Sequence, residues 1–371
     1  MAKILVTGGL GFIGSHTVDQ LINDGQKVVV LDNLERQVHF GNTPSFRNPK
    51  ADYIKGDIRY RKHWIKALED VDGVIHLAGA VGIGQSFWQA RKYMDINVGG
   101  TSTFFEVLLT NKNLSKKIEK IVVASSKSLY GEGAYKCSEH GVIYPMPRGI
   151  EQLHNHTWEI LCPSCGRETQ ATPMPEDKPP QNLNPYSLSK YATERLAMDY
   201  SDVLGIPTVA LRYFNVYGPR QSLSNPYTGV VAIFLSRLKN GNPPFIFEDG
   251  NQLRDYIYVE DVARINRLSL NKGNGVYNVG TGIPNSLRDV VNILNDNLGT
   301  SIDPNISGEF RPGDNRHDFA NISKLEKDYG VSSFINFRKG MEILVSESKT
   351  ISAIDYFDRE EKERRRFLSN Q

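Results

Sequence analysis

The stretch Lys3-Ile4-Leu5-Val6-Thr7-Gly8-Gly9-Leu10-Gly11-Phe12-Ile13-Gly14 opens the chain and decides its fold. The first five of these residues predict a short buried strand, and a glycine turn follows at once. Residues 13–24 then predict a helix that ends at Gly25. A dinucleotide-binding fingerprint needs this order of strand, glycine turn and helix, because glycines let the backbone approach a pyrophosphate at the helix N-terminus. The opening of the chain therefore predicts a dinucleotide site.

A second apolar run, residues 28–31, ends in Asp32. An acidic side chain at the end of the second strand can accept hydrogen bonds from both hydroxyls of an adenosine ribose. It would repel a 2′-phosphate, so the sequence favours NAD over NADP. Arg36 lies close enough in the sequence to weaken that preference.

Strand-like and helix-like runs alternate through the first two hundred residues. The further strand-like runs are residues 53–57, 73–79, 121–126 and 208–213. Such alternation predicts an α/β fold of the Rossmann type, a doubly wound parallel sheet with helices on both faces. Ligands bind outside the carboxyl ends of such strands. The residues at or just past these ends are Gly8, Asp32, Asp57, Gly79, Ser126 and Asn215.

Tyr186 is followed four residues later by Lys190, in the segment Asn-Pro-Tyr-Ser-Leu-Ser-Lys. Positions i and i+4 share one face of a helix, so the lysine should lie beside the phenol. A nearby cation favours the phenolate and lowers the phenol pKa from about 10. Ser126 could hydrogen-bond the same substrate oxygen. On its own this Tyr-x-x-x-Lys spacing is common and also fits a chance surface pair. The glycine loop and Ser126 elsewhere in the sequence favour a catalytic tyrosine.

Composition excludes several classes of function. The 371 residues carry 44 basic and 42 acidic side chains, a formal net charge of +2. This balance argues against a nucleic-acid-binding protein, including a zinc-ribbon module fused to an enzyme fold. No apolar run reaches the roughly 20 residues of a membrane span. The first predicted strand starts at Lys3, which leaves no room for a signal peptide, so we expect a cytoplasmic protein.

Together these motifs resemble the extended short-chain dehydrogenase/reductase family, in its nucleotide-sugar epimerase and dehydratase branch. The resemblance runs from about residue 3 to about residue 345, with one insertion. It implies NAD as cofactor, a nucleotide-diphosphate sugar as substrate, and Ser126, Tyr186 and Lys190 as the catalytic trio. It also implies substrate contacts from Ser126, Asn215, Arg254 and Arg311. The matched cofactor positions are Gly8, Gly11, Phe12, Ile13, Gly14, Asp32, Asn33, Asp57, Ile58, Leu77, Ala78, Gly79, Asn97, Tyr186 and Lys190.

The residues after Ser126 bear on the reaction. The 4,6-dehydratases of this branch carry Asp and Glu there, whereas this chain has Lys127 and Ser128. Water elimination is therefore not expected, and the resemblance implies 4-epimerization through transient oxidation at sugar C4. The alternatives within the family are a net dehydrogenase or reductase, which could use the same trio, and a 4,6-dehydratase. A binding protein with NAD as a structural ligand is the alternative from another class, but it has no need of the trio. We also expect a homodimer.

All three cysteines lie in the segment between Tyr130 and Tyr186, which is longer than is usual for the family. Cys137, His140, Cys162 and Cys165 have the spacing of a zinc ribbon, and four such ligands would make a closed, structural site. His154 and His156 compete for the fourth position. A redox Cys-x-x-Cys pair and a plain loop are the alternatives. The insertion resembles a subgroup linked to deoxysugar epimerases, including dTDP-L-rhamnose 4-epimerases.

The sequence thus predicts three regions and an insertion. Residues 1–215 should form the NAD-binding Rossmann domain, with a zinc-ribbon-like insertion at 134–178. Residues 216–345 should form mainly a smaller substrate lobe, with 254–265 returning to the Rossmann domain. The charged tail 346–371 should end in a solvated helix to which we assign no function.

Overall fold

The fold is built around a seven-stranded sheet, described here from a computed structural model that covers residues 1–225, 227–311 and 313–368. The strand order is β13-β9-β5-β4-β1-β2-β3, and every neighbouring pair is parallel. All residues of β4, β5 and β9 are buried, as expected for a parallel sheet that is covered on both faces. The strands are β1 (Lys3–Thr7), β2 (Lys27–Asp32), β3 (Asp52–Lys55), β4 (Gly73–His76), β5 (Lys120–Ser126), β9 (Thr208–Tyr213) and β13 (Gly275–Val279).

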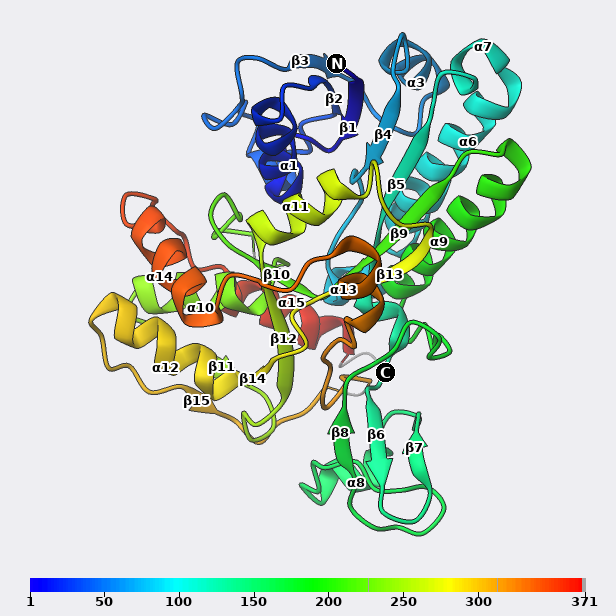
Figure 1. Cartoon of the computed structure of the whole chain (residues 1–371). Helices are drawn as coiled ribbons and strands as arrows, with labels where there is room; N and C mark the ends of the chain where they lie inside the picture. Colours follow the sequence, from blue (N-terminus) through cyan, green and yellow to red (C-terminus); the bar gives the residue numbers. More distant parts are fainter. Residues whose placement is uncertain (226, 312, 369–371) are drawn as a thin grey trace.

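Helices cover both faces of this sheet, which confirms the predicted Rossmann-type fold (Figure 1). On one face α1 (Phe12–Asn23), α11 (Val259–Leu268) and α13 (Ser323–Tyr329) contribute to one apolar core, which includes Val18 and Ile265. On the other, α3 (Arg61–Ala67), α6 (Gly100–Thr110) and α9 (Pro185–Leu204) pack around Trp64 and Phe104. Shorter helical segments are α2 (Arg36–His39), α4 (Ile83–Trp88), α5 (Ala90–Tyr93), η1 (Met94–Gly99), α7 (Lys112–Ser115) and η2 (Lys127–Tyr130).

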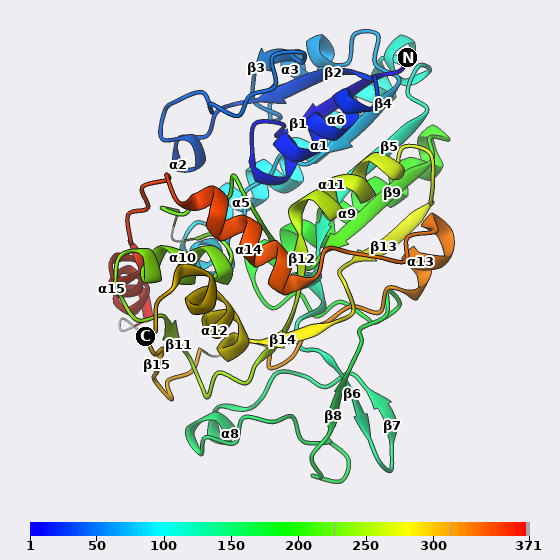
Figure 2. The same ribbon diagram turned by 60° about the vertical axis from the view of Figure 1, so that its left-hand side comes forward.

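The smaller lobe has its own core between α10, α12 and α14 and a short three-stranded sheet. Its elements are β10 (Asn215–Tyr217), α10 (Val230–Lys239), β11 (Phe245–Ile246), β12 (Leu253–Tyr258), β14 (Pro284–Ser286), α12 (Leu287–Leu298), β15 (Asn305–Ile306) and α14 (Phe337–Ser348). In Figure 2 this lobe lies beyond the carboxyl ends of the large sheet. A cleft between the two parts is thereby placed where a ligand is expected.

The structure draws the boundary between the two parts differently from the sequence. The strand β13 completes the large sheet, and α11 and α13 pack on it, so residues 259–279 and 323–329 belong to the cofactor half. The predicted return at 254–265 is therefore made by α11 alone. Its first part is β12, which pairs with β10 and β14 in the lobe. The predicted single domain boundary after residue 215 does not describe this arrangement, because the chain crosses between the cofactor half and the lobe several times.

The insertion forms a small unit away from the helices of the large sheet (Figure 1). Its antiparallel strands, in the order β7-β6-β8, are β6 (Ala134–Cys137), β7 (Gly141–Ile143) and β8 (Gln170–Thr172), with the helix α8 (Ile150–His154) beside them. A small unit with so little apolar core needs another source of stability, such as a metal.

The charged tail forms the helix α15 (Phe357–Leu368), which packs against the lobe. The Phe357 and Phe245 rings lie 5.6 Å apart, and Arg365 pairs with Glu309 at 2.8 Å. The tail is therefore helical, as predicted, but it is docked by these contacts. Among the helices that the structure describes, none is both long and apolar enough to cross a membrane.

Candidate active site

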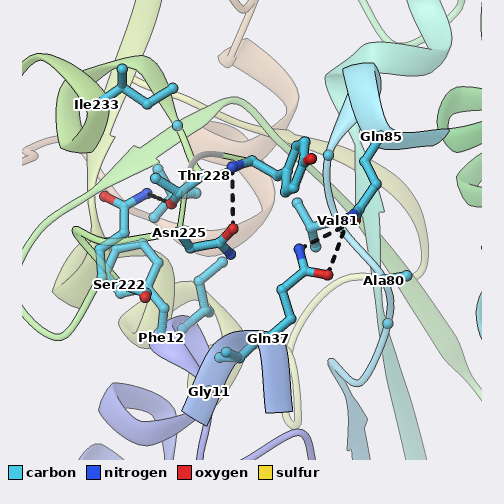
Figure 3. Close-up of a pocket in the computed structure, with 18 of the residues that line it drawn as sticks. Gly11, Phe12, Gln37, Ala80, Val81, Gln85, Ser222, Asn225, Thr228 and Ile233 are labelled. Atoms are coloured by element: carbon cyan, nitrogen blue, oxygen red, sulfur yellow. Dashed lines mark hydrogen bonds between the residues drawn. The ribbon is translucent and has the colours of Figure 1, made fainter. Parts of the chain in front are cut away.

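A cavity of 1980 Å³ lies between the carboxyl ends of the large sheet and the lobe. Figure 3 shows part of it, where Gln37 and Gln85 exchange amide hydrogen bonds of 3.2 and 3.1 Å near Gly11 and Phe12. Of the predicted catalytic, cofactor and substrate residues, all line the cavity except Asn97. Asn97 is buried behind it, where its amide binds the backbone of Ala80 and the Ser189 hydroxyl.

The glycine loop leaves room for a phosphate group at the start of α1. A Cβ atom on Gly14 would lie 2.1 Å from the carbonyl oxygen of Gly8, so no larger residue fits there. Gly8 itself has φ +68°, a left-handed conformation that favours glycine. No side chain caps the N-terminus of α1, which begins after Gly11 on the cavity wall. Its backbone N–H groups are thus available to an anion, and the loop fits the pyrophosphate of NAD.

Asp32 lies at the end of β2 and is 8% exposed. Its two carboxylate oxygens accept backbone N–H groups from Leu10 at 3.0 Å and Leu34 at 2.9 Å. These bonds fix the carboxylate while each oxygen keeps capacity for a further donor, as a ribose diol would need. Arg36 is exposed and is not among the cavity-lining residues, so its charge does not offset Asp32 inside the site.

We expect Asp32→Ala to weaken NAD binding by roughly 10- to 100-fold, because hydrogen bonds to a charged group contribute about 1.5–3 kcal/mol. Relative use of NADP should improve, since the negative charge is gone. Calorimetric titration with both cofactors tests this. Asp24→Ala removes an acidic residue that is not among the cavity-lining residues and that pairs with Arg267 outside the cavity, so it serves as the control. Unchanged affinities for both cofactors would show that Asp32 does not face the ribose.

Tyr186 and Lys190 are carried by the first turns of α9. Pro185 starts this helix, and Asn184 and Ser187 form a reciprocal capping box that fixes its entry. Ser126 ends β5 and lies on the cavity wall with Tyr186, where its hydroxyl acts on the pKa of the phenol. The structure thus brings the three predicted residues together from two elements that are sixty residues apart in sequence.

The acid–base properties of this trio differ in part from the sequence prediction. Among the chain's own groups, burial raises the pKa of Tyr186, and the hydrogen bond to Ser126 opposes that rise. Burial lowers the pKa of Lys190 to about 8, and the Glu194 carboxylate opposes this. The expected lowering of the phenol pKa by Lys190 is not observed, because burial and Ser126 are the influences that set this pKa. A positive group beyond the chain itself is needed to favour the phenolate.

A buried network that the sequence reading missed supports α9 against β9. Glu194 accepts two hydrogen bonds from the Arg212 guanidinium, at 2.9 and 2.7 Å, and one from Ser125 at 2.7 Å. Arg212 also donates to the Tyr130 hydroxyl at 2.6 Å. Glu194 lies four residues after Lys190, so the helical spacing that paired Tyr186 with Lys190 could have found it.

On the substrate side, the buried Asp318 joins several cavity-lining residues. Its carboxylate accepts from Lys127 at 2.5 Å, pairs with Arg254 at 3.2 Å, and accepts from Asn215 at 3.3 Å. Burial lowers the pKa of Lys127, and Asp318 opposes this. No motif in the sequence points to Asp318, because its role depends on three distant segments.

The two predicted arginines are in different situations. Arg254 donates to the backbone carbonyl oxygens of Leu253, Arg316 and Asn315, at 2.8 to 2.9 Å. Most of its N–H groups are therefore already used, and it does not present a free fork to the cavity. Arg311 pairs with Asp314 at 2.7 Å and lies over the Phe247 ring at 4.6 Å, nearer the surface.

In the insertion the four predicted metal ligands converge. Cys137 Sγ lies 3.6 Å from His140 Nδ1 and 3.7 Å from Cys165 Sγ, and Cys162 Sγ lies 3.5 Å from His140 Nδ1. All four ligand atoms lie within 4.8 Å of one another. A tetrahedron with Zn–S bonds of about 2.3 Å has edges of about 3.8 Å, so the cluster has the size of a zinc site. His154 and His156 instead pack on Phe310 and Trp158.

Comparison with known proteins gives a consistent result. The sequence matches the NAD dependent epimerase/dehydratase family over residues 4–147 and 162–280. The chain belongs to this family. It is an enzyme of the extended short-chain dehydrogenase/reductase type, as the sequence motifs predicted.

Among its relatives, a dTDP-L-rhamnose 4-epimerase of Burkholderia thailandensis is 33% identical over 340 residues, covering 88% of this chain and 90% of the relative. A putative UDP-glucose 4-epimerase of Methanocaldococcus jannaschii is 34% identical over 345 residues, covering 92% and 97%. The structure of the UDP-glucuronic acid 4-epimerase of Bacillus cereus with UDP-glucuronic acid and NAD has a TM-score of 0.75 at 28% identity, covering 94% and 99%. The epimerase/dehydratase fold thus spans nearly the whole enzyme.

Proposed function

We propose that this enzyme is an NAD-dependent nucleotide-sugar 4-epimerase. The observation that carries the proposal is the convergence of Ser126, Tyr186 and Lys190 on the cavity wall, between the glycine loop and the lobe. Positions 127 and 128 hold no carboxylate, and Lys127 is engaged with Asp318. This arrangement supports redox chemistry at one carbinol carbon and gives a dehydratase no acid where its family relatives carry one.

In the proposed mechanism the chain moves one proton and holds the sugar. The glycine loop and Asp32 would hold NAD, which would supply a reversible acceptor for the hydride of sugar C4 and a positive ring that favours the Tyr186 phenolate. Tyr186 accepts the proton of the C4 hydroxyl and gives it back once the keto sugar has turned over. Ser126 would donate to the same oxygen, and Lys190, one helical turn from Tyr186, would contact the cofactor ribose. The product has the mass of the substrate.

The proposed substrate class is a nucleotide-diphosphate sugar. The relatives named above differ in both nucleotide base and sugar, so their names support the class and not one compound. A dTDP-linked deoxysugar such as dTDP-L-rhamnose is the first compound to test, because that relative covers 88% of the chain. The cations Lys127, Arg254 and Arg311 on the cavity wall suit the negative charge of a diphosphate.

The proposal also includes a structural metal, an oligomeric state and a cellular location. The Cys137, His140, Cys162 and Cys165 cluster is proposed to hold one structural zinc, because four ligands leave no open position for catalysis. We also propose that the enzyme acts as a homodimer in the cytoplasm. Light scattering tests the dimer.

The function is tested by incubating the purified enzyme with UDP- and dTDP-linked hexoses, deoxyhexoses and uronic acids, followed by proton NMR and mass spectrometry. We expect a C4 epimer of unchanged mass from at least one sugar and no loss of water from any. Accumulation of NADH would favour the alternative of a net dehydrogenase. A 4-keto-6-deoxy product from the native enzyme would contradict the proposed reaction class.

A further inference from the structure

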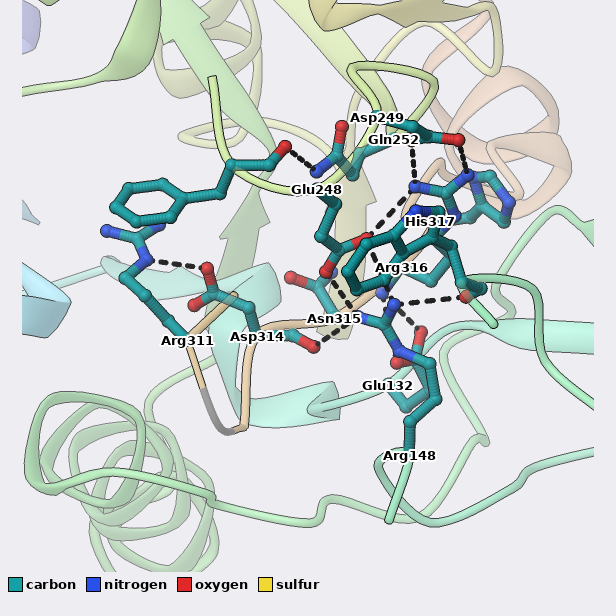
Figure 4. Close-up of polar contacts among 12 residues, drawn as sticks. Glu132, Arg148, Glu248, Asp249, Gln252, Arg311, Asp314, Asn315, Arg316 and His317 are labelled. Carbon is teal, nitrogen blue, oxygen red and sulfur yellow. Dashed lines mark hydrogen bonds and ion pairs between the residues drawn. The ribbon is translucent and has the colours of Figure 1, made fainter. Parts of the chain in front are cut away.

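Residues 314–318 connect the cavity with the insertion. Asp314 and Asn315 line the cavity, while Arg316 and His317 are buried against the insertion and the lobe. Figure 4 shows this segment among the acidic and basic side chains of both. This short segment therefore has some side chains at the cavity and others at the contact between the insertion and the lobe.

Arg316 is fully buried, and all three of its guanidinium nitrogens are engaged. Nε and Nη2 donate to Glu159 in the insertion, at 3.0 and 2.5 Å. In the lobe, Nη1 donates to Glu248 at 3.0 Å, and Nη1 and Nη2 donate to Asp249 at 2.7 and 2.9 Å. A guanidinium shared between two units holds them in one geometry, because its donors form a rigid planar fork.

The insertion holds the same segment at further points. Glu159 also contacts His317, with 2.9 Å between Oε2 and Nε2. Arg148 donates to Glu248 at 2.8 and 3.0 Å, and to the carbonyl oxygen of Asp314 at 3.1 Å. Residues 314–318 are thus fixed from the insertion side through both side chains and backbone.

On the cavity side, the same segment fixes two cations. The backbone carbonyl oxygens of Asn315 and Arg316 accept from Arg254, and Asp318 pairs with both Arg254 and Lys127. A displacement of the segment would therefore move Lys127 and Arg254 together. Within the described parts of the chain, no hydrogen bond or ion pair joins Tyr186 or the glycine loop to residues 314–318.

We propose that Glu159 is a positioning residue through which the insertion sets the substrate-binding wall. It acts through Arg316 and His317 on residues 314–318, and these hold Lys127 and Arg254 in place for an anionic nucleotide-diphosphate substrate. This inference rests on the proposed function for its substrate class. The insertion is thereby a structural part of the substrate site, although none of its described residues lines the cavity.

The test is Glu159→Gln, which keeps the shape of the side chain and removes its charge. The Glu159 side chain is 42% exposed, so the enzyme should still fold. We expect KM for the nucleotide sugar to rise about tenfold with kcat at saturation nearly unchanged, because the residues displaced, Lys127 and Arg254, would hold the bound substrate and not its reacting carbon. Kd for UDP or dTDP should rise in parallel, and Kd for NAD should stay at its wild-type value.

Glu139→Gln is the matched control. It removes the same charge in the same insertion, from an exposed pair with Arg167 at 2.8 Å, and should leave KM unchanged. A Glu159→Gln enzyme with wild-type KM and nucleotide Kd, but a lower melting temperature, would overturn the proposal and leave Glu159 a stability role only.

The role of Glu159 can be tested even if this variant does not fold or the enzyme has another activity. If Glu159→Gln does not fold, Asp249→Asn loosens the same guanidinium from the lobe side and is measured in the same way. If the wild-type enzyme binds UDP or dTDP but epimerizes no sugar, the proposed function is wrong. The comparison of nucleotide Kd values still decides the role of Glu159 in that case.

Discussion

Replacing Tyr186 by phenylalanine is expected to lower kcat by about 10²- to 10⁴-fold, the usual contribution of a positioned acid or base. The ring stays in place against Tyr93, with ring centroids 6.1 Å apart, so the cavity wall should keep its shape. Only the phenol hydroxyl is lost. NAD binding should therefore remain close to that of the wild type.

The measurement is the rate of epimer formation by NMR, with NAD affinity determined by calorimetry on the same preparations. Tyr191→Phe is the control, because Tyr191 lies on the same helix and is not among the cavity-lining residues. It should retain full activity. Lost NAD binding with turnover retained in Tyr186→Phe would contradict the assignment of the phenol as proton acceptor.

The second large effect is expected from Cys162→Ser, which removes one of four ligands from the proposed zinc site. Structural zinc sites contribute roughly 10–16 kcal/mol to folding of small metal-bound units, so the insertion should lose order without its metal. We expect about one zinc per chain in the wild type by elemental analysis and far less in the variant. Residues 134–178 should become protease-sensitive below the melting temperature of the cofactor half.

Ser164→Ala is the matched control, since Ser164 is exposed between the two cysteines and is not among the clustered ligands. It should keep both the zinc and the protease resistance. A wild-type protein without metal, whose insertion is equally ordered, would disprove the zinc site. The insertion would then be a plain loop that happens to gather three thiols.

The cofactor half was predictable because its signals are local. The strand, the glycine turn and the helix of residues 3–24 are adjacent in the sequence, and so are Tyr186 and Lys190 on α9. The strand β13 was missed because it lies in a Gly- and Asn-rich region and joins the sheet only through a long crossover. The Rossmann fold itself was confirmed.

The substrate side was less predictable because it depends on tertiary contacts. Asp318, Lys127 and Arg254 come from three separate parts of the chain and meet only in the fold. No local sequence pattern at any one of them predicts the other two. Arg254 was expected to contact the substrate, yet backbone carbonyl oxygens accept most of its N–H groups. The raised pKa of Tyr186 was also missed, since burial is set by packing that no local motif encodes.

The central claim is that C4 is oxidised and then reduced within one active site. The most direct measurement uses a nucleotide sugar that the enzyme converts, labelled with deuterium at C4, and follows the label by NMR and mass spectrometry. The account expects the epimer to keep its deuterium at C4, because the hydride that leaves is the one that returns. Loss of the label to solvent, or its appearance in free NADH, would contradict epimerization by transient oxidation at C4.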